Sequence, residues 1–303
     1  MPERDRYGHM GCTAELLDII RVGNTLGEGI LWDPLQQGLW WTDIQERCLY
    51  RYDLETASLR RYALPERLGS FGFVKDSDRL IAAFETGVAL YDPGSGQPDW
   101  LARPEHDPAH VRFNDGRVDR QGRFWTGTMI QDQGEPQGKL YCLEGDRARV
   151  HLTDIAISNS ICFSPDGKQL YFADTPRREI LRYDLDEGGT LSRREVFART
   201  PEGAFPDGSN VDAEGHVWNA QWNAGRVVRY APDGTISAEV AVPASQPTCV
   251  AFGGRGLDLL FVTSAREGLD AQSLRDQPHA GDVFVYRLNV RGLTDARYAA
   301  GNK

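Results

Sequence analysis

A repeat of about 45 residues constrains this chain more than any other feature of its sequence. Short strand-like runs recur with this period, and glycine and proline residues separate them. The second run of each unit covers residues 38–43, 79–84, 122–127, 169–174, 215–220 and 257–262, and the third run covers 49–52, 88–91, 139–142, 180–183, 227–230 and 283–286. Six copies of each run predict six equivalent units placed around an axis.

The spacing of these runs predicts the fold class. No long helical pattern competes with the strands, and turn sequences such as residues 165–167 (Pro-Asp-Gly) connect them. We therefore expect an all-β, six-bladed β-propeller with four-stranded antiparallel blades, and one domain over residues 1–303. Residues 15–20 are expected to add the outer strand of the sixth blade and so close the ring. Residues 1–13 are expected to form a loosely ordered N-terminal extension.

Charge and cysteine content narrow the partners and the compartment. The formal net charge is −10, and no basic run occurs, so we expect neither nucleic acid nor an anionic membrane surface as a partner. The five cysteines are scattered without a CxxC pair, which indicates free thiols in a reducing compartment. The sequence shows no secretory signal and no apolar stretch of about 20 residues, so we expect a cytoplasmic protein. A monomer or a weak homo-oligomer is expected.

Six residues share one phase of the repeat, and each comes just before an expected innermost strand. We call them the marker residues; they are Glu28, Ser70, Asn114, Asn159, Asp207 and Thr248. Innermost strands line the channel of a propeller, so the segments that enter them open onto one mouth. Glu28, Asn159 and Asp207 together offer three oxygen ligands and a charge of −2. Such a set suits one divalent cation with open positions; it favours Ca²⁺, Mg²⁺ or Mn²⁺, and Zn²⁺ and Fe²⁺ stay open.

Residues 112–116 (Arg-Phe-Asn-Asp-Gly) contain a strong turn signal. A second turn follows directly at residues 119–122, so we interpret the first as a loop that presents Arg112 and Asn114 to a substrate. A surface ion pair of Arg112 is the alternative. The sequence has no GxSxG, HExxH, GxGxxG or phosphate-loop motif. His110 and His279 fall in expected loops and are predicted to be surface residues.

At these residues the chain resembles the senescence-marker-protein/gluconolactonase family, which includes regucalcin and bacterial sugar lactonases. The matching segments are 26–29, 112–116 with 127–129, 157–159 with 164–167, 206–208 with 211–215, and 247–254. The resemblance implies a six-bladed propeller with one divalent metal held by Glu28, Asn159 and Asp207, and substrate contacts from Arg112 and Asn114. It also implies an acidic contact at Asp132, where the family usually has Glu. Ile30 and Ser160 depart from the proline and glycine common in the family.

The resemblance implies hydrolysis of a sugar lactone to the aldonic acid. The metal would polarise the lactone carbonyl. Asp207 would act as general base on water, or would only position a hydroxide on the metal. Arg112, Asn114 and Asp132 would orient sugar hydroxyls. The alternatives are a broader esterase, like the paraoxonases, and a non-catalytic calcium-binding propeller. The particular sugar and the particular metal are left open.

Overall fold

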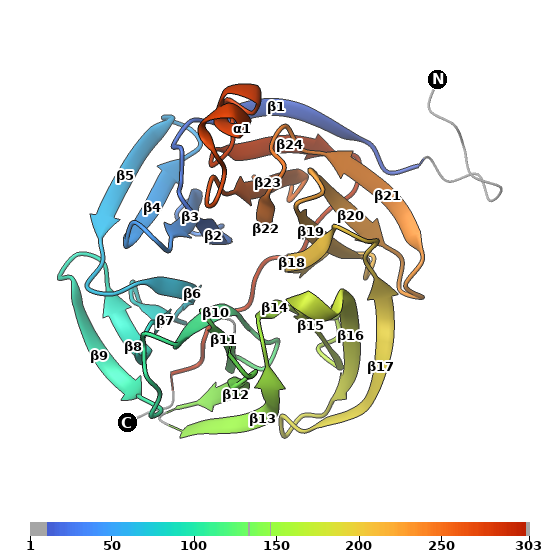
Figure 1. The fold of residues 1–303 in the computed structure, drawn as a ribbon. Helices are drawn as coiled ribbons and strands as arrows, with labels where there is room; N and C mark the ends of the chain where they lie inside the picture. The colour runs from blue at the N-terminus through green and yellow to red at the C-terminus, as the bar shows by residue number, and fades with distance from the viewer. Residues whose placement is uncertain (1–10, 133, 146, 301–303) are drawn as a thin grey trace.

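The computed structural model describes residues 11–132, 134–145 and 147–300, and these residues form a six-bladed β-propeller (Figure 1). Each blade is a four-stranded antiparallel sheet, and the blades surround a central channel. The fold predicted from the repeat is therefore confirmed. Among the described residues no helix has the length and apolarity to span a membrane.

Every blade runs from an innermost strand at the channel to an outermost strand at the periphery. In that order, the blades consist of β2 (Gly27–Asp33), β3 (Gly38–Asp43), β4 (Cys48–Asp53) and β5 (Ser58–Ala63); β6 (Leu68–Phe73), β7 (Leu80–Phe84), β8 (Gly87–Asp92) and β9 (Gln97–Ala102); β10 (Val111–Val118), β11 (Phe124–Ile130), β12 (Gly138–Glu144) and β13 (Arg147–Ile155); β14 (Ser158–Phe163), β15 (Gln169–Asp174), β16 (Glu179–Leu185) and β17 (Leu191–Arg199); β18 (Phe205–Val211), β19 (Val217–Trp222), β20 (Arg226–Tyr230) and β21 (Ile236–Ala241); β22 (Pro247–Gly253), β23 (Leu259–Ser264), β24 (Val283–Leu288) and β1 (Ala14–Ile20).

The ring closes as predicted, because β1 pairs with β24 as the outermost strand of the sixth blade. A sheet that combines the two ends of the chain removes the open edge of the ring. Of the expected N-terminal extension, residues 1–10 lie outside the described residues. Gly11 and Thr13 hydrogen-bond Asn289, at 3.0 and 2.8 Å.

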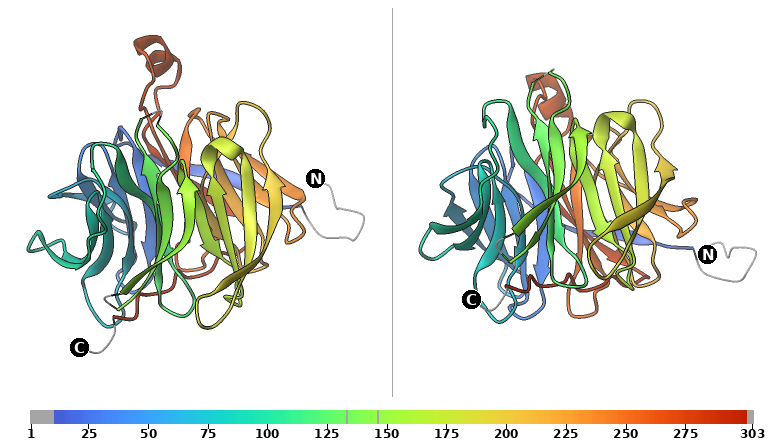
Figure 2. Two further views of the ribbon diagram at one scale, coloured as in Figure 1. Left: turned by 60° about the horizontal axis from the view of Figure 1, so that its bottom comes forward. Right: turned by 90° about the horizontal axis from the view of Figure 1, so that it is seen from below.

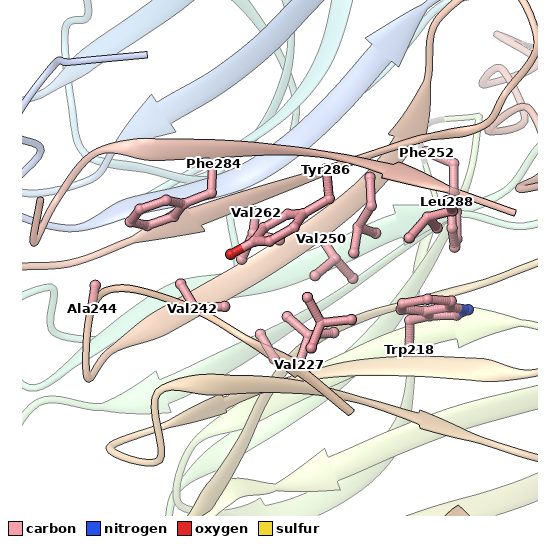
Figure 3. Close-up of a cluster of buried hydrophobic side chains, with 13 residues drawn as sticks. Trp218, Val227, Val242, Ala244, Val250, Phe252, Val262, Phe284, Tyr286 and Leu288 are labelled. Carbon is pink, nitrogen blue, oxygen red and sulfur yellow. The ribbon is translucent and has the colours of Figure 1, made fainter. Parts of the chain in front are cut away.

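The hydrophobic core lies between neighbouring blades. Between the fifth and sixth blades, Trp218 of β19 meets Phe252 of β22 edge-on, with ring centroids 5.7 Å apart (Figure 3). Val227, Val262 and other β-branched and aromatic residues fill the same interface. Similar buried clusters occur at the other blade interfaces. Because each blade packs on two neighbours, the innermost strands are fixed in position around the channel.

Two short helices stand on one face of the ring, which we call the mouth face. The helix η1 (Thr175–Arg177) connects β15 to β16, and α1 (Ala271–Asp276) lies in the segment between β23 and β24. Seen from the side, α1 projects from this face, while the described segment that follows β24 lies on the opposite face (Figure 2). We call residues 265–282 the α1 loop.

Residues 289–300, which we call the strap, cross the opposite face of the ring and were not assigned a role from the sequence. The strap forms backbone hydrogen bonds with the sixth, fifth, third and second blades. It also places Asp295 against Arg117 of β10, with Nη1 and Oδ1 2.5 Å apart and both side chains at most 8% exposed. The strap thus closes the end of the channel away from the mouth face.

We predict that Asp295→Ala destabilises the protein strongly. The substitution leaves the Arg117 guanidinium buried with the Ser209 carbonyl as its remaining acceptor, at 3.2 Å. Loss of one partner from a buried ion pair costs about 3–5 kcal/mol, which urea unfolding would measure. The control is Glu55→Ala, because the Arg255–Glu55 pair is exposed and is worth at most about 1 kcal/mol. Equal losses in the two variants would contradict a structural role for the strap.

Candidate active site

Each innermost strand has a register irregularity beside its marker residue. The shifts lie between Glu28 and Leu31, Leu68 and Ser70, Phe113 and Gly116, Asn159 and Cys162, Pro206 and Ser209, and Pro247 and Val250. A bulge re-aims the side chains of the strand that contains it. The marker residues therefore lie inside the innermost strands near their beginnings, and not ahead of them as the sequence suggested.

The loop predicted for residues 112–116 is wrong, because β10 runs through them from Val111 to Val118. The Asn-Asp-Gly sequence forms the bulge of this strand and not a turn. Gly116 serves close packing: a Cβ there would lie 2.6 Å from Ser70 Oγ of the neighbouring blade. Arg112 and Asn114 nevertheless lie at the mouth of the channel among the residues that line one pocket, and their contact with a substrate stays a prediction.

Two bulges need a left-handed residue after the marker. Gly29 has a φ of 59° and Ser160 a φ of 60°. Glycine adopts this conformation freely, whereas another residue loses about 1–2 kcal/mol. Ser160 compensates with a hydrogen bond, because its Oγ donates to the Asp207 carbonyl at 2.6 Å. Serine at this position therefore connects the backbones that carry two predicted ligands.

Two of the six marker residues are structural. Thr248 Oγ1 donates to the Gly27 carbonyl at 2.5 Å and so ties the sixth blade to the first. Ser70 Oγ lies 3.2 Å from Thr126 Oγ1 of the third blade. The other four markers, Glu28, Asn114, Asn159 and Asp207, line the pocket at the mouth.

A chain of hydrogen bonds joins the third blade to the fourth at this pocket. Arg112 Nη1 donates to Asn114 Oδ1 at 2.7 Å, and Asn114 Nδ2 lies 3.1 Å from Asn159 Oδ1. Asn159 Nδ2 in turn donates to Thr175 Oγ1 at 2.8 Å. These contacts determine the orientation of both amides, so that the Asn159 oxygen faces Asn114 and the pocket.

The backbone of Asp207 is held from two sides. Its carbonyl accepts from Ser160 Oγ and also from Asn219 Nδ2, the latter at 3.1 Å. Thr175 Oγ1 donates to the neighbouring Pro206 carbonyl at 2.9 Å. These backbone contacts fix the position of Asp207 in the strand, and its carboxyl group contacts Glu28 and the Gly208 amide.

Glu28 and Asp207 bring two buried carboxyl groups into contact, with a hydrogen bond between them. The pKa of Glu28 is raised to about 8, mainly by burial and secondly by the negative charge of nearby Asp115. The pKa of Asp207 is raised well above its ordinary value, mainly by burial and secondly by the negative charges of Glu28 and Asp115. Two carboxylates in such a place repel each other unless a proton or a cation lies with them.

The pocket around these groups has a volume of about 360 Å³. Its polar residues are Glu28, Arg112, Asn114, Asn159, Thr175, Asp207 and Glu267, and its apolar residues are Leu26, Met129, Ile157, Pro176, Phe205 and Trp222. A few convergent polar groups within mainly apolar walls are typical of a small-molecule site. The pKa of Arg112 is lowered to about 10, mainly by burial and secondly by the positive charge of nearby Arg67. The negative charges of Glu267 and Glu28 act in the opposite direction.

The donor set fits a divalent cation. Glu28, Asn159 and Asp207 offer hard oxygen atoms, and the crowding of two buried carboxyl groups is relieved when a dication lies between them. Asp212, Glu214 and His216 form another acidic cluster on the described residues. It does not fit a cation equally well, because Arg229 already pairs with Asp212 at 2.8 Å and also with Glu214.

Asp132 and the two loop histidines lie away from the pocket lining. The Asp132 side chain is 48% exposed and pairs with His110, whose Nδ1 lies 2.5 Å from it. His279 lies 3.1 Å from Asp282. The substrate contact of Asp132 therefore stays a prediction. The sequence analysis missed Glu267, Thr175 and Asn219, which belong to other phases of the repeat or to the α1 loop.

Residues 26–266 match the family described as SMP-30/Gluconolactonase/LRE-like region. The chain belongs to this family. The match spans five complete blades and every residue of the pocket lining except Glu267, and the family predicted from the sequence is confirmed.

Curated relatives and solved structures agree with this assignment. The chain is 40% identical over 285 residues to 6-deoxy-6-sulfogluconolactonase of Pseudomonas putida, which covers 93% of this chain and 97% of the relative. It is 43% identical over 281 residues to L-arabinolactonase of Azospirillum brasilense, with 91% and 93% covered. The structure of a calcium-binding protein, regucalcin, from Agrobacterium tumefaciens is similar with a TM-score of 0.89 and 36% identity, covering 93% of this chain and 97% of that one.

We predict that Glu28→Gln stabilises the metal-free protein and removes its response to cations. The variant lacks one of two adjacent buried carboxyl groups, and its thermal midpoint in a chelator should rise by about 2–4 °C for each kcal/mol gained. A carboxyl group with a raised pKa destabilises the fold as pH rises, because it loses its proton in a buried place. The difference in thermal midpoint between the variant and the wild type should therefore grow as the pH rises from 4.5 to about 8.

Calcium should raise the midpoint of the wild-type protein and not that of the Glu28→Gln variant. Glu46→Gln, at an exposed residue of the mouth face, is the control and should keep the response. A calcium response retained by Glu28→Gln would remove Glu28 from the ligand set.

Proposed function

We propose that this protein hydrolyses a sugar lactone to the corresponding aldonic acid and that it depends on one divalent cation. The observation that supports this most directly is the pocket itself, in which two contacting carboxyl groups, an amide oxygen and a buried guanidinium converge. Relatives of 40% and 43% identity over most of the chain carry the names of sugar lactonases.

Glu28, Asn159 and Asp207 would hold the cation, which when bound would polarise the lactone carbonyl as a Lewis acid. The likeness to a structure called a calcium-binding protein supports calcium as one candidate. Carboxylate and amide oxygens also suit Mg²⁺ and Mn²⁺. The charge of Asp115, buried near both carboxyl groups, would strengthen binding of any of these cations.

Asp207 would move the proton of the reaction. A water oxygen forms a bond to the carbonyl carbon while an Asp207 oxygen takes its proton, and the bond from that carbon to the ring oxygen then breaks. Asp207 returns the proton to the departing ring oxygen, so that a hydroxy acid is released. Burial and the charges of Glu28 and Asp115 raise the pKa of Asp207 in the metal-free protein, and a bound cation would lower it again. Positioning of the attacking group by Asp207, without proton transfer, is the variant of this mechanism.

Arg112 and Asn114 would bind the sugar. Arg112 uses Nη1 for Asn114 and the Phe113 carbonyl, so its other nitrogens can donate to ring hydroxyls. The apolar walls, with Trp222 and Phe205, would pack against the carbon face of the ring. Asp132 stays a predicted contact. A non-catalytic calcium site would need no buried guanidinium at its edge, which favours the enzyme.

We predict that metal-stripped protein is inactive and that adding back one divalent cation restores hydrolysis. The assay uses a panel of pure aldonolactones, including arabinono-, xylono-, galactono- and gluconolactone, with Ca²⁺, Mg²⁺, Mn²⁺, Zn²⁺ or Fe²⁺ supplied one at a time. Aryl esters and organophosphates serve as comparison substrates. Turnover of the aryl esters alone would favour the broader esterase, and no turnover with any cation would contradict lactonase activity.

We predict that Asp207→Asn lowers kcat by at least about 100-fold, because the amide cannot accept the proton of water. The variant keeps the backbone contacts of Asp207, which involve its carbonyl. Its thermal midpoint in a chelator should therefore not fall below that of the wild type. Asp233→Asn in an exposed turn is the matched control and should keep full activity. An active Asp207→Asn variant would contradict both proposed roles of Asp207.

A further inference from the structure

The α1 loop contributes one charged residue to the pocket, Glu267. The loop is anchored beside the first blade: the Glu267 amide donates to the Thr25 carbonyl at 3.0 Å, and Ala265 forms a bridge with Leu26. Thr25 lies three residues before Glu28 in the chain, on the side of the mouth. Three residues of extended chain span about 10 Å. Glu267 thus lies at the rim of the pocket, above the two contacting carboxyl groups.

The Glu267 side chain is oriented by a neighbour. Gln45 Nε2, from the turn between β3 and β4, donates to Glu267 Oε1 at 2.5 Å. The carboxylate acts on Arg112 across the pocket, and among the carboxylates that raise the pKa of Arg112 it has the largest effect, ahead of Glu28. No ion pair joins Arg112 to Glu267 in the described part of the chain. A ligand can therefore lie between the guanidinium and the carboxylate.

We propose that Glu267 makes this pocket select lactones without a charged substituent and reject those that carry an anionic group at the end remote from the carbonyl. This inference rests on the lactonase function proposed above. With a dication bound, that cation and Arg112 face three carboxylates of the pocket lining, and Asp115 adds a buried negative charge near two of them. Loss of Glu267 would make the pocket more positive by one charge and would weaken its repulsion of an anion.

Hydrogen bonding leads to the same selection. An ionised carboxylate only accepts, so Glu267 matches a hydroxyl group, which can donate. A phosphate or sulfonate offers acceptor oxygens and a negative charge, and beside Glu267 it would be both repelled and unpaired. Glu267 thus combines attraction for the uncharged substrate with repulsion of the charged one.

The test compares two lactones of one ring and one stereochemistry, D-glucono-1,5-lactone and its 6-phosphate, on the metal-loaded protein. The wild type should prefer the uncharged lactone in kcat/KM. Glu267→Gln keeps an acceptor for Gln45 and removes the charge, and it should reduce that preference about tenfold, mainly through a lower KM for the phosphate. Glu46→Gln removes an equal charge from an exposed residue on the same face and should leave the preference unchanged.

Equilibrium binding separates this inference from the reaction. Calorimetry with 1,5-anhydro-D-glucitol and its 6-phosphate needs no turnover, so it tests Glu267 even if neither lactone is hydrolysed. Tighter binding of the phosphate to Glu267→Gln than to the wild type and to Glu46→Gln would support the proposal. An unchanged preference in Glu267→Gln, or an equal change in both variants, would overturn it, as would absence of binding by either compound.

Discussion

The contact between Glu28 and Asp207 is the interaction on which the rest of the site depends. Two buried carboxyl groups repel each other when both are ionised, and burial alone already disfavours their charged forms. A free pair of side chains would move apart or turn to solvent. Here the two residues belong to strands of the first and fifth blades, and each strand is fixed by the blades on both sides. The energy of packing between blades therefore maintains an arrangement that is unfavourable by itself and favourable with a cation.

The closure of the ring and the strap explain how this packing is secured. β1 joins the two ends of the chain in the sixth blade, and the strap then crosses to the opposite side of the ring. Its Asp295 neutralises Arg117, which is in the same strand as Arg112, Asn114 and Asp115. Charge thus alternates along the channel, from the carboxyl pair and Asp115 to Arg117 and then to Asp295. The buried charge of Arg117 thus has an opposite charge beside it, whereas the two contacting acids at the mouth meet each other.

The sequence predicted the parts of the protein that repeat. The six blades, the closure by residues 15–20 and the family were confirmed, because a period of about 45 residues and short apolar runs encode them directly. The phase of the repeat also brought Glu28, Asn114, Asn159 and Asp207 to one pocket, as expected. It could not separate them from Ser70 and Thr248, which lie at equivalent positions but bond neighbouring blades. The loop expected at residues 112–116 was wrong because a bulge and a turn use the same residues, Asn, Asp and Gly.

Features outside the repeat left no signal in the sequence. Glu267 and the strap belong to segments that occur once, and their partners, Gln45 and Arg117, are more than 170 residues away along the chain. This difference has a physical consequence. Side chains on the innermost strands are constrained by two neighbouring blades, so the chemistry they support is hard to alter without disturbing the ring. The α1 loop projects from the mouth face and packs on few elements, so its residues can change with the substrate. We infer that in this architecture the innermost strands supply the groups that react with and bind the sugar, whereas the α1 loop adjusts which substituents the pocket accepts.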